Sequence, residues 1–164
     1  MPRDRERERE RESGDGKRSS QTRRLETVPF TAKFTEELGE ESIIVIKGKL
    51  TDDPLRFDVN FQRGDSPEAD ILFHFNPRFK EELEKIIFNS RGPDGWGFQG
   101  EKYENITTRG SSFKLVFVVW RNCFQVSVSG RHILEFPHRI EEWKPDTVIV
   151  FGDIEVESID VLRL

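Results

Sequence analysis

The stretch ILFHFNPRF, residues 71–79, decides the fold class because its character alternates with a period of two. One set of alternate positions is apolar and mainly aromatic: Ile71, Phe73, Phe75, Pro77 and Phe79. The other set carries an imidazole, an amide and a guanidinium in a row: His74, Asn76 and Arg78. Side chains of a β-strand point alternately to its two faces. The stretch therefore predicts a strand with one face in a core and the other toward solvent or a ligand.

The same period recurs through the chain. Phe57, Val59 and Phe61 alternate with polar residues, and residues 42–50 and 84–90 indicate two further strands. Residues 113–120 (FKLVFVVW) are apolar on both faces, which is typical of a central strand covered on both sides.

Two hairpin patterns complete the prediction. Residues 123–136 contain the turn Ser129-Gly130, and residues 146–164 are interrupted near Gly152. We count about ten to twelve short strands with polar turns and no sustained helical period, an estimate by pattern. These features predict an all-β fold, a two-sheet antiparallel β-sandwich of the jelly-roll type.

The N-terminal segment differs from the rest in composition. Residues 1–24 contain no Ile, Val, Leu, Phe or Trp, so we expect a disordered Arg/Glu-rich tail, followed by one domain at 25–164. The tail has nine basic and six acidic residues, and residues 25–164 have 17 and 25, a net charge of −8. This acidity argues against nucleic acid as a partner.

The chain also lacks the marks of membrane or disulfide-rich secreted proteins. The single cysteine, Cys123, excludes an internal disulfide, and no apolar run reaches the length of a membrane span. The N-terminus has no apolar segment after its first charges, so we expect synthesis in the cytosol.

The polar row on residues 74–78 suits a neutral ligand rich in hydroxyl groups. Side chains two residues apart on a strand lie about 6–7 Å apart, the size of a sugar ring. Arg donates through a rigid fork, while Asn and neutral His both donate and accept, as hydroxyl groups do. Asn89 follows on the next strand, and Trp96, in a glycine-rich turn, offers a flat surface for the C–H face of a pyranose.

Metal and enzyme sites fit the residues less well. The histidines have no metal-ligand spacing, so we expect no metal and no cofactor. A glycoside hydrolase needs two carboxylates beside the scissile bond. The polar strands offer only Asp58 and Glu101, which have no reason to converge. We therefore predict a binding protein and not an enzyme.

Several motifs together resemble the galectins, the β-galactoside-binding animal lectins. They are HFNPRF at 74–79, IIFNS at 86–90, GWG at 95–97, FQVSVSGRHILEFPHRI at 124–140 and IDVLRL at 159–164. The resemblance covers residues 27–164 and implies a concanavalin-like jelly roll. It implies β-galactoside glycans on glycoproteins or glycolipids as partners, and export from the cytosol to the extracellular space without a leader. Whether the domain forms a homodimer stays open.

The resemblance also implies a role for each motif residue. His74 and Arg78 would hydrogen-bond the axial 4-hydroxyl of galactose, and Asn76 would share it. Asn89 would meet the 6-hydroxyl, and Trp96 would stack under the ring. Arg56, Asp58 and Asn60 on the neighbouring strand are candidates for an extended site, with a solvated strand face as the alternative.

The sequence departs from the family pattern after the tryptophan. The family usually has W-G-x-E-x-R, whereas this chain has Gln99 and Glu101 at those two positions. We hypothesise that Glu101 pairs with Arg78 from two residues further on, and that contacts to a second sugar are altered. The alternative function is a galectin-fold protein-interaction module whose lactose binding is weak or lost.

Overall fold

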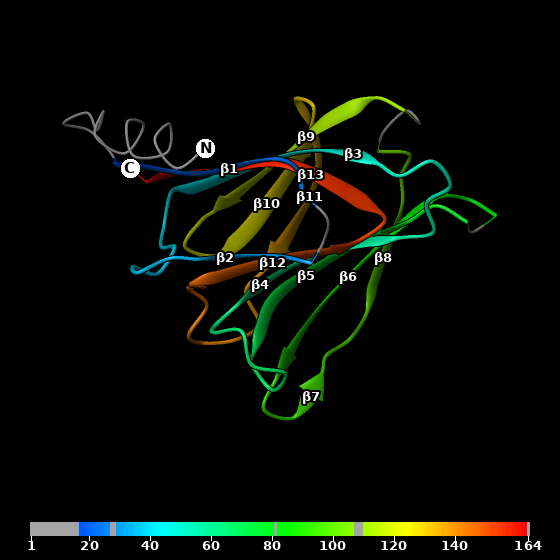
Figure 1. Ribbon diagram of the computed structural model, residues 1–164. Coiled ribbons are helices and arrows are strands. Elements are labelled where there is room, and N and C mark those ends of the chain that lie inside the picture. The colour runs from blue at the N-terminus through cyan, green and yellow to red at the C-terminus, as the bar shows by residue number, and fades with distance from the viewer. Residues whose placement is uncertain (1–16, 27–28, 81, 107–109, 164) are drawn as a thin grey trace.

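The computed structural model describes residues 17–26, 29–80, 82–106 and 110–163. Across these ranges all regular structure is β-strand (Figure 1), and no helix is present that could cross a membrane. The strands are β1 (Lys17–Glu26), β2 (Phe30–Lys33), β3 (Ser42–Leu50), β4 (Phe57–Gln62), β5 (Ile71–Arg78), β6 (Lys85–Gly92), β7 (Gly95–Trp96), β8 (Gly100–Tyr103), β9 (Ser112–Val119), β10 (Cys123–Val128), β11 (Arg131–Pro137), β12 (Thr147–Gly152) and β13 (Ile154–Arg163).

The strands form two antiparallel sheets that lie face to face (Figure 1). One sheet has the order β1-β13-β3-β9-β10-β11. The other has the order β2-β12-β4-β5-β6-β7, and β8 pairs with β6 on the same side as β7. The predicted all-β, two-sheet sandwich is confirmed.

Phenylalanines from both sheets fill the space between them. Phe61 on β4 packs on Phe117 with ring centroids 4.8 Å apart, and Phe73 on β5 packs on Phe136 at the same separation. All four are at most 1 % exposed, and burying a side chain of this size contributes about 2–3 kcal/mol. The apolar face of residues 71–79 thus anchors β5 in the core and fixes which side chains face outward.

Both predicted turns lie where the sequence placed them. Ser129 and Gly130 have φ angles of 47° and 85°, the paired positive values of a two-residue turn that matches strand twist. Gly152 has φ 100°, and a Cβ there would lie 2.7 Å from the carbonyl oxygen of Arg56. The β12–β13 turn therefore requires glycine for its conformation and for its close approach to the chain before β4.

The prediction that residues 113–120 are covered on both faces is wrong. Phe113, Leu115 and Phe117 of β9 face the core, but Val116 and Val118 lie on the outer face and are half-buried. Their cross-strand partners on β3 are Val45 and Ile43. Neighbouring β-branched side chains shield one another there, so an apolar outer face needs no third layer.

The expected boundary after residue 24 falls inside a strand. Lys17–Glu26 form β1, which pairs with β13 from Lys17 opposite Arg163 to Glu26 opposite Val156, with one register shift. Strand pairing uses backbone N–H and C=O groups, so residues 17–24, which include no large apolar side chain, can still extend a sheet. The rest of the expected tail, residues 1–16, lies outside the described residues.

Candidate functional site

A groove of about 640 Å³ runs over the outer face of the seven-stranded sheet, across β12, β4, β5 and β6. It is lined by Arg56, Asp58, Asn60, Ile71, His74, Arg78, Ile87, Asn89, Arg91, Trp96, Gly97, Gln99 and Phe151. Eight of the ten residues singled out from the sequence are among these. The other two are Asn76, which is fully buried, and Glu101, which lies on β8.

Strand register brings the groove residues together. Asn60 on β4 lies opposite His74 on β5, which in turn lies opposite Asn89 on β6. One row of polar side chains thus crosses three strands. Neighbouring strands lie about 4.8 Å apart, so these three side chains span roughly 10 Å.

His74 is neutral at pH 7 and held by a neighbour. Burial lowers the pKa of His74 to about 4, although the Asp58 carboxylate acts to raise it, and the Arg56 and Arg78 guanidiniums lower it further. Nδ1 lies 2.6 Å from the side-chain carbonyl oxygen of Asn60, which can only accept. The proton therefore lies on Nδ1, and Nε2 keeps a lone pair that can accept a hydrogen bond.

Asn76 on β5 is hydrogen-bonded to β4 beneath the floor of the groove. Its amide nitrogen donates to the Phe57 carbonyl oxygen at 2.8 Å and to Asp58 Oδ1 at 3.2 Å. Its amide oxygen accepts from Arg78 Nε at 3.1 Å. Both N–H groups of Asn76 are thereby used, and its oxygen retains one lone pair. Arg78 is held by Nε, while its terminal nitrogens have no partner among the described residues.

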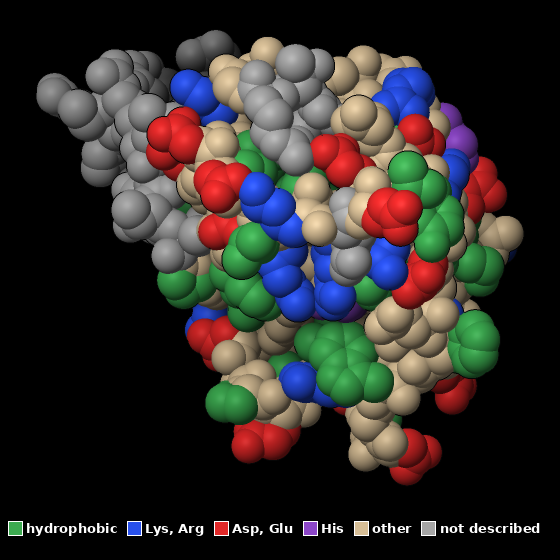
Figure 2. All heavy atoms as spheres, turned by 90° about the vertical axis from the view of Figure 1, so that its right-hand side faces the viewer, with side chains coloured by type: hydrophobic (Ala, Val, Ile, Leu, Met, Phe, Trp, Pro, Cys, Tyr) green, Lys and Arg blue, Asp and Glu red, His purple; other side chains and the backbone are tan. Residues whose placement is uncertain are grey.

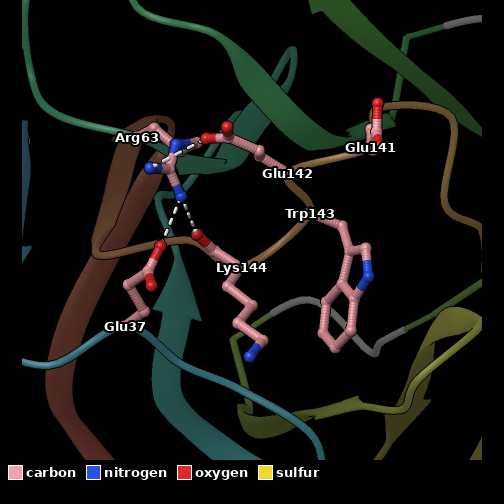
Figure 3. A pocket seen from close by; sticks show the side chains of 6 residues that line it. All are labelled: Glu37, Arg63, Glu141, Glu142, Trp143 and Lys144. Atoms are coloured by element: carbon pink, nitrogen blue, oxygen red, sulfur yellow. Dashed lines mark hydrogen bonds and ion pairs between the residues drawn. The ribbon is translucent and has the colours of Figure 1, made fainter.

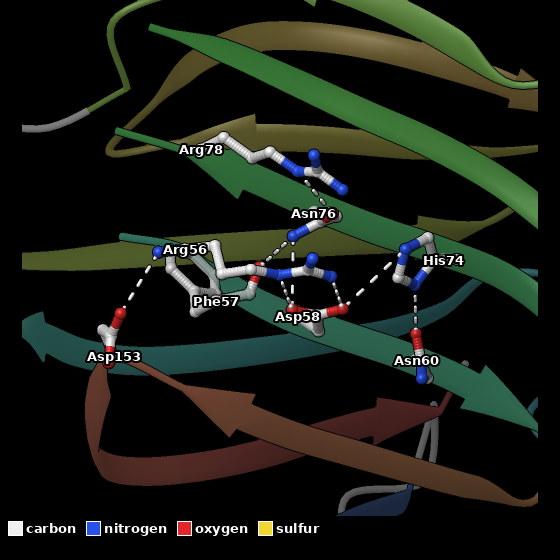
Figure 4. Close-up of polar contacts among 8 residues, drawn as sticks. All are labelled: Arg56, Phe57, Asp58, Asn60, His74, Asn76, Arg78 and Asp153. Carbon is white, nitrogen blue, oxygen red and sulfur yellow. Dashed lines mark hydrogen bonds and ion pairs between the residues drawn. The ribbon is translucent and has the colours of Figure 1, made fainter. Parts of the chain in front are cut away.

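Arg56 and Asp58 form the charged pair of the groove (Figure 4). Arg56 donates Nε to Asp58 Oδ1 at 3.1 Å and Nη2 to Oδ2 at 2.8 Å, a two-point contact. The Asp153 carboxylate accepts from the Arg56 backbone N–H at 3.2 Å and so fixes the chain before β4. Asp58 is 2 % exposed, and this pairing satisfies a carboxylate that would be costly to bury alone.

Basic side chains outnumber acidic ones in the groove. Arg56, Arg78 and Arg91 line it against the single carboxylate of Asp58. Figure 2 shows Lys and Arg side chains gathered in a band above an exposed hydrophobic group. Since Arg56 is paired with Asp58, the positive charges without a carboxylate partner in the groove lining are those of Arg78 and Arg91.

Trp96 stands at the rim of the groove on β7 and is 51 % exposed. The edge of its ring contacts His74, with centroids 5.0 Å apart and planes at 60°. The Arg91 guanidinium lies 5.6 Å from the centre of the indole, and its Nη2 donates to the carbonyl oxygens of Pro67 and Ala69. The indole is thus oriented from two sides yet keeps half of its surface open.

The hypothesised pair between Glu101 and Arg78 is wrong. The Glu101 carboxylate lies 3.4 Å from Lys85 Nζ and accepts from Gln99 Nε2 at 3.3 Å. Sheet order explains the difference, because β8 pairs with β6, which carries Lys85, whereas Arg78 lies on β5, on the other side of β6. Lys85 therefore stands nearer to Glu101 and takes its carboxylate.

Sequence reasoning missed five lining residues: Ile71, Ile87, Arg91, Gly97 and Phe151. The period of two was a usable signal for Ile87 and Arg91, since both lie two residues from Asn89 on β6. Phe151 had no such signal. It reaches the groove because β12 places it opposite Asp58, and that register is set by the sheet.

Comparisons with known proteins agree on one family. A family model described as galactoside-binding lectin matches residues 29–161. Galectin-8 of Rattus norvegicus is 41 % identical over 135 residues, and human galectin-12 is 34 % identical over 139. These matches cover 81 % and 84 % of this chain, and 42 % and 41 % of the two relatives.

A solved structure resembles the fold. Sheep galectin-11 in complex with glycerol has a TM-score of 0.73 and 26 % sequence identity, covering 84 % of this chain and 98 % of that one. The chain spans about two-fifths of the length of the curated relatives it matches.

Proposed function

The chain belongs to the family of galactoside-binding lectins, and we propose that it binds β-galactosides in the groove over β4, β5 and β6, as a lectin and not as an enzyme. The observation that carries the proposal is the buried network around Asn76. The network anchors Arg78 from beneath, so the groove offers an acceptor on His74 and donors on Arg78. A hydroxyl group can donate one hydrogen bond and accept two, so one ligand hydroxyl matches this set.

The axial 4-hydroxyl of galactose is the group assigned to this position. It donates to His74 Nε2 and accepts from the Arg78 guanidinium, which Asn76 holds in place. The ring then stacks its C–H face on Trp96, and Asn89 meets the 6-hydroxyl. Glucose has an equatorial 4-hydroxyl and would leave these polar groups without partners, which costs about 1–3 kcal/mol for each buried group.

Contacts to a second sugar differ from the family pattern. Gln99 donates to Glu101, and Glu101 is also tied to Lys85. The second sugar therefore meets a neutral amide and a paired carboxylate. About 0.3 kcal/mol for each of roughly 23 heavy atoms of a disaccharide gives a dissociation constant near ten micromolar. Strong binding to cell-surface glycans would then need several sites at once.

The test compares lactose with cellobiose, whose non-reducing rings differ only in the configuration at C4. We expect the full-length chain to be retained on immobilised lactose and to be released by free lactose but not by cellobiose. Trp96→Ala should abolish retention. Trp120→Ala, which removes an indole between β9 and β10, is the matched control and should leave retention unchanged.

The alternative is a protein-interaction module with the galectin fold. The observation that favours it is the exposed Gln99–Glu101–Lys85 contact, which replaces the usual carboxylate and arginine. Absence of retention on every galactoside of a glycan array would favour this alternative. Release of free galactose from lactose would indicate a hydrolase, although both oxygens of Asp58 are engaged by Arg56.

A further inference from the structure

We propose that Arg139, outside the groove lining, is a positioning residue that fixes the side-chain amide of Asn89 so that it offers a ligand only a hydrogen-bond donor. The inference rests on the proposed function for the identity of the ligand. Arg139 follows β11, at the start of the connection to β12. Its Nη1 donates to Asn89 Oδ1 at 2.9 Å.

The hydrogen bonds of Asn89 determine which way its amide points. Oδ1 accepts from Arg139 Nη1 and from the Ser90 backbone N–H at 2.8 Å, so both of its lone pairs are used. Nδ2 donates one hydrogen to the Gly97 carbonyl oxygen at 3.0 Å. The second hydrogen of Nδ2 has no partner in the described part of the chain, and Asn89 lines the groove.

The guanidinium of Arg139 has little freedom to move away. Its central carbon lies 4.7 Å from the centre of the Phe136 ring, a core side chain that is 1 % exposed. On another side it approaches Gly97, where a Cβ would lie 3.0 Å from Arg139 Nη1. Gly97 directly follows Trp96, and its lack of a side chain leaves room for the guanidinium of Arg139.

The segment that carries Arg139 is fastened at both ends. His138 stacks on Trp143 with ring centroids 4.4 Å apart and contacts Phe124 at 4.8 Å. Arg63, beyond the end of β4, donates to the Lys144 carbonyl oxygen at 3.0 Å and pairs with Glu142 at 3.2 Å (Figure 3). Arg139 therefore projects from a fixed backbone.

A fixed amide has a consequence for specificity. A carbonyl oxygen that already accepts two hydrogen bonds cannot accept a third from the ligand, so the ligand atom at Asn89 must carry a lone pair. The 6-hydroxyl of galactose meets this condition. The ammonium group of a 6-amino-6-deoxygalactoside at pH 7 has donors only and does not. We expect such an analogue to bind at least tenfold more weakly than the parent galactoside.

The first test measures the amide without any sugar. In ¹⁵N-labelled full-length protein, the side-chain amide signals of Asn89 are assigned by their loss in Asn89→Ala. In Arg139→Gln these signals should move toward those of solvent-exposed asparagines and exchange faster with water. Arg131→Gln is the matched control, because Arg131 on β11 pairs with Glu104 at 2.7 Å, away from Asn89. Unchanged Asn89 signals in Arg139→Gln would overturn the proposal.

The second test is a double-mutant cycle with lactose. We expect Arg139→Gln to weaken lactose binding about fivefold to tenfold, in the range of one charge-assisted hydrogen bond. In the Asn89→Ala background the same substitution should change affinity by less than about twofold, since Arg139 acts through Asn89. If Arg139→Gln weakened lactose binding by the same factor in both backgrounds, Arg139 would not act through Asn89. If the wild type binds no galactoside, the proposed function fails, and the amide spectra still decide the role of Arg139.

Discussion

The two sides of the groove are built in different ways. On the β4–β5 side, Asp58, Asn60 and Asn76 are 2 %, 6 % and 0 % exposed, and each is hydrogen-bonded to a neighbour. On the β7–β8 side, Trp96 is 51 % exposed and Phe98 86 % exposed. The first side is organised without a ligand, because its buried polar groups are hydrogen-bonded to one another. The second side is more exposed to solvent, and we expect it to tolerate substitution better.

The largest expected effect concerns the protonation of His74 on the buried side. Its pKa in the folded protein, about 4, lies below the ordinary value of 6.5, so the unfolded chain takes up a proton first as the pH falls. The contribution of neutral His74 to stability is therefore fully present above pH 6.5 and is lost as the pH falls toward 4. The shift corresponds to about 3 kcal/mol. Lactose binding should weaken below about pH 5, because protonated Nε2 no longer accepts a hydrogen bond.

Urea unfolding between pH 7.5 and 4 measures this effect. His74→Gln is the reference, because it keeps the carboxylates that also titrate in this range but lacks the imidazole. The wild type should lose about 3 kcal/mol more than the variant over this interval. Parallel curves for the two proteins would show that His74 does not carry the pH dependence.

Asn76→Ala should have the next largest effect. The substitution leaves the buried Phe57 carbonyl oxygen without its donor and frees Arg78 from its anchor. We expect a loss of about 2 kcal/mol in the free energy of unfolding, together with a weakening of lactose binding by about a hundredfold. Asn122→Ala on the exposed β9–β10 turn should change neither quantity. Equal results for the two variants would remove the distinction between the two sides of the groove.

Gly100→Ala tests a sterically constrained point on the exposed side. A Cβ at Gly100 would lie 2.1 Å from the Phe88 ring, so either the ring or β8 must move. We expect thermal or urea unfolding to show a loss of about 1–3 kcal/mol. Gly39→Ala is the control, because a Cβ there meets only Lys144 at 3.7 Å. A stable Gly100→Ala variant would mean that β8 adapts as freely as its surroundings.

Glu101→Gln should have the smallest effect. Glu101 is exposed and its pairing with Lys85 is long, and such pairs contribute about 0–1 kcal/mol. Lactose affinity, measured by calorimetry, should change by less than about twofold. A loss of more than fivefold would show that Glu101 acts on the ligand or on Arg78, and that the exposed side is as constrained as the buried one.

The same contrast explains what could be predicted from the sequence. The pattern of residues 71–79 and the Ser129-Gly130 turn depend on neighbouring residues, so the longer strands β3–β6 and β9–β13, both turns and the sandwich were predicted correctly, whereas the short strands β2, β7 and β8 were not. Cross-strand partners depend on register, which brings together side chains that are far apart in the sequence. Lys85 beside Glu101 and Phe151 beside Asp58 arise in this way, and neither could be read from local pattern.

Residues that act through another residue were also missed. Arg139 lies 50 positions from Asn89 in the chain, and nothing in its neighbours marks it as part of the site. β1 was missed for a further reason, because its pairing with β13 uses the backbone, on which composition has no bearing.

β1 also matters for anyone who shortens the chain. A truncated protein that begins at residue 25, as composition suggests, would lack most of the strand that covers β13. The uncovered edge would present a row of backbone donors and acceptors beside the apolar residues Ile154, Val156, Ile159 and Val161. Exposed edges of this kind recruit strands from other molecules. Such a truncation would therefore give precipitation or false oligomers in solution, and both would be misread as properties of the lectin.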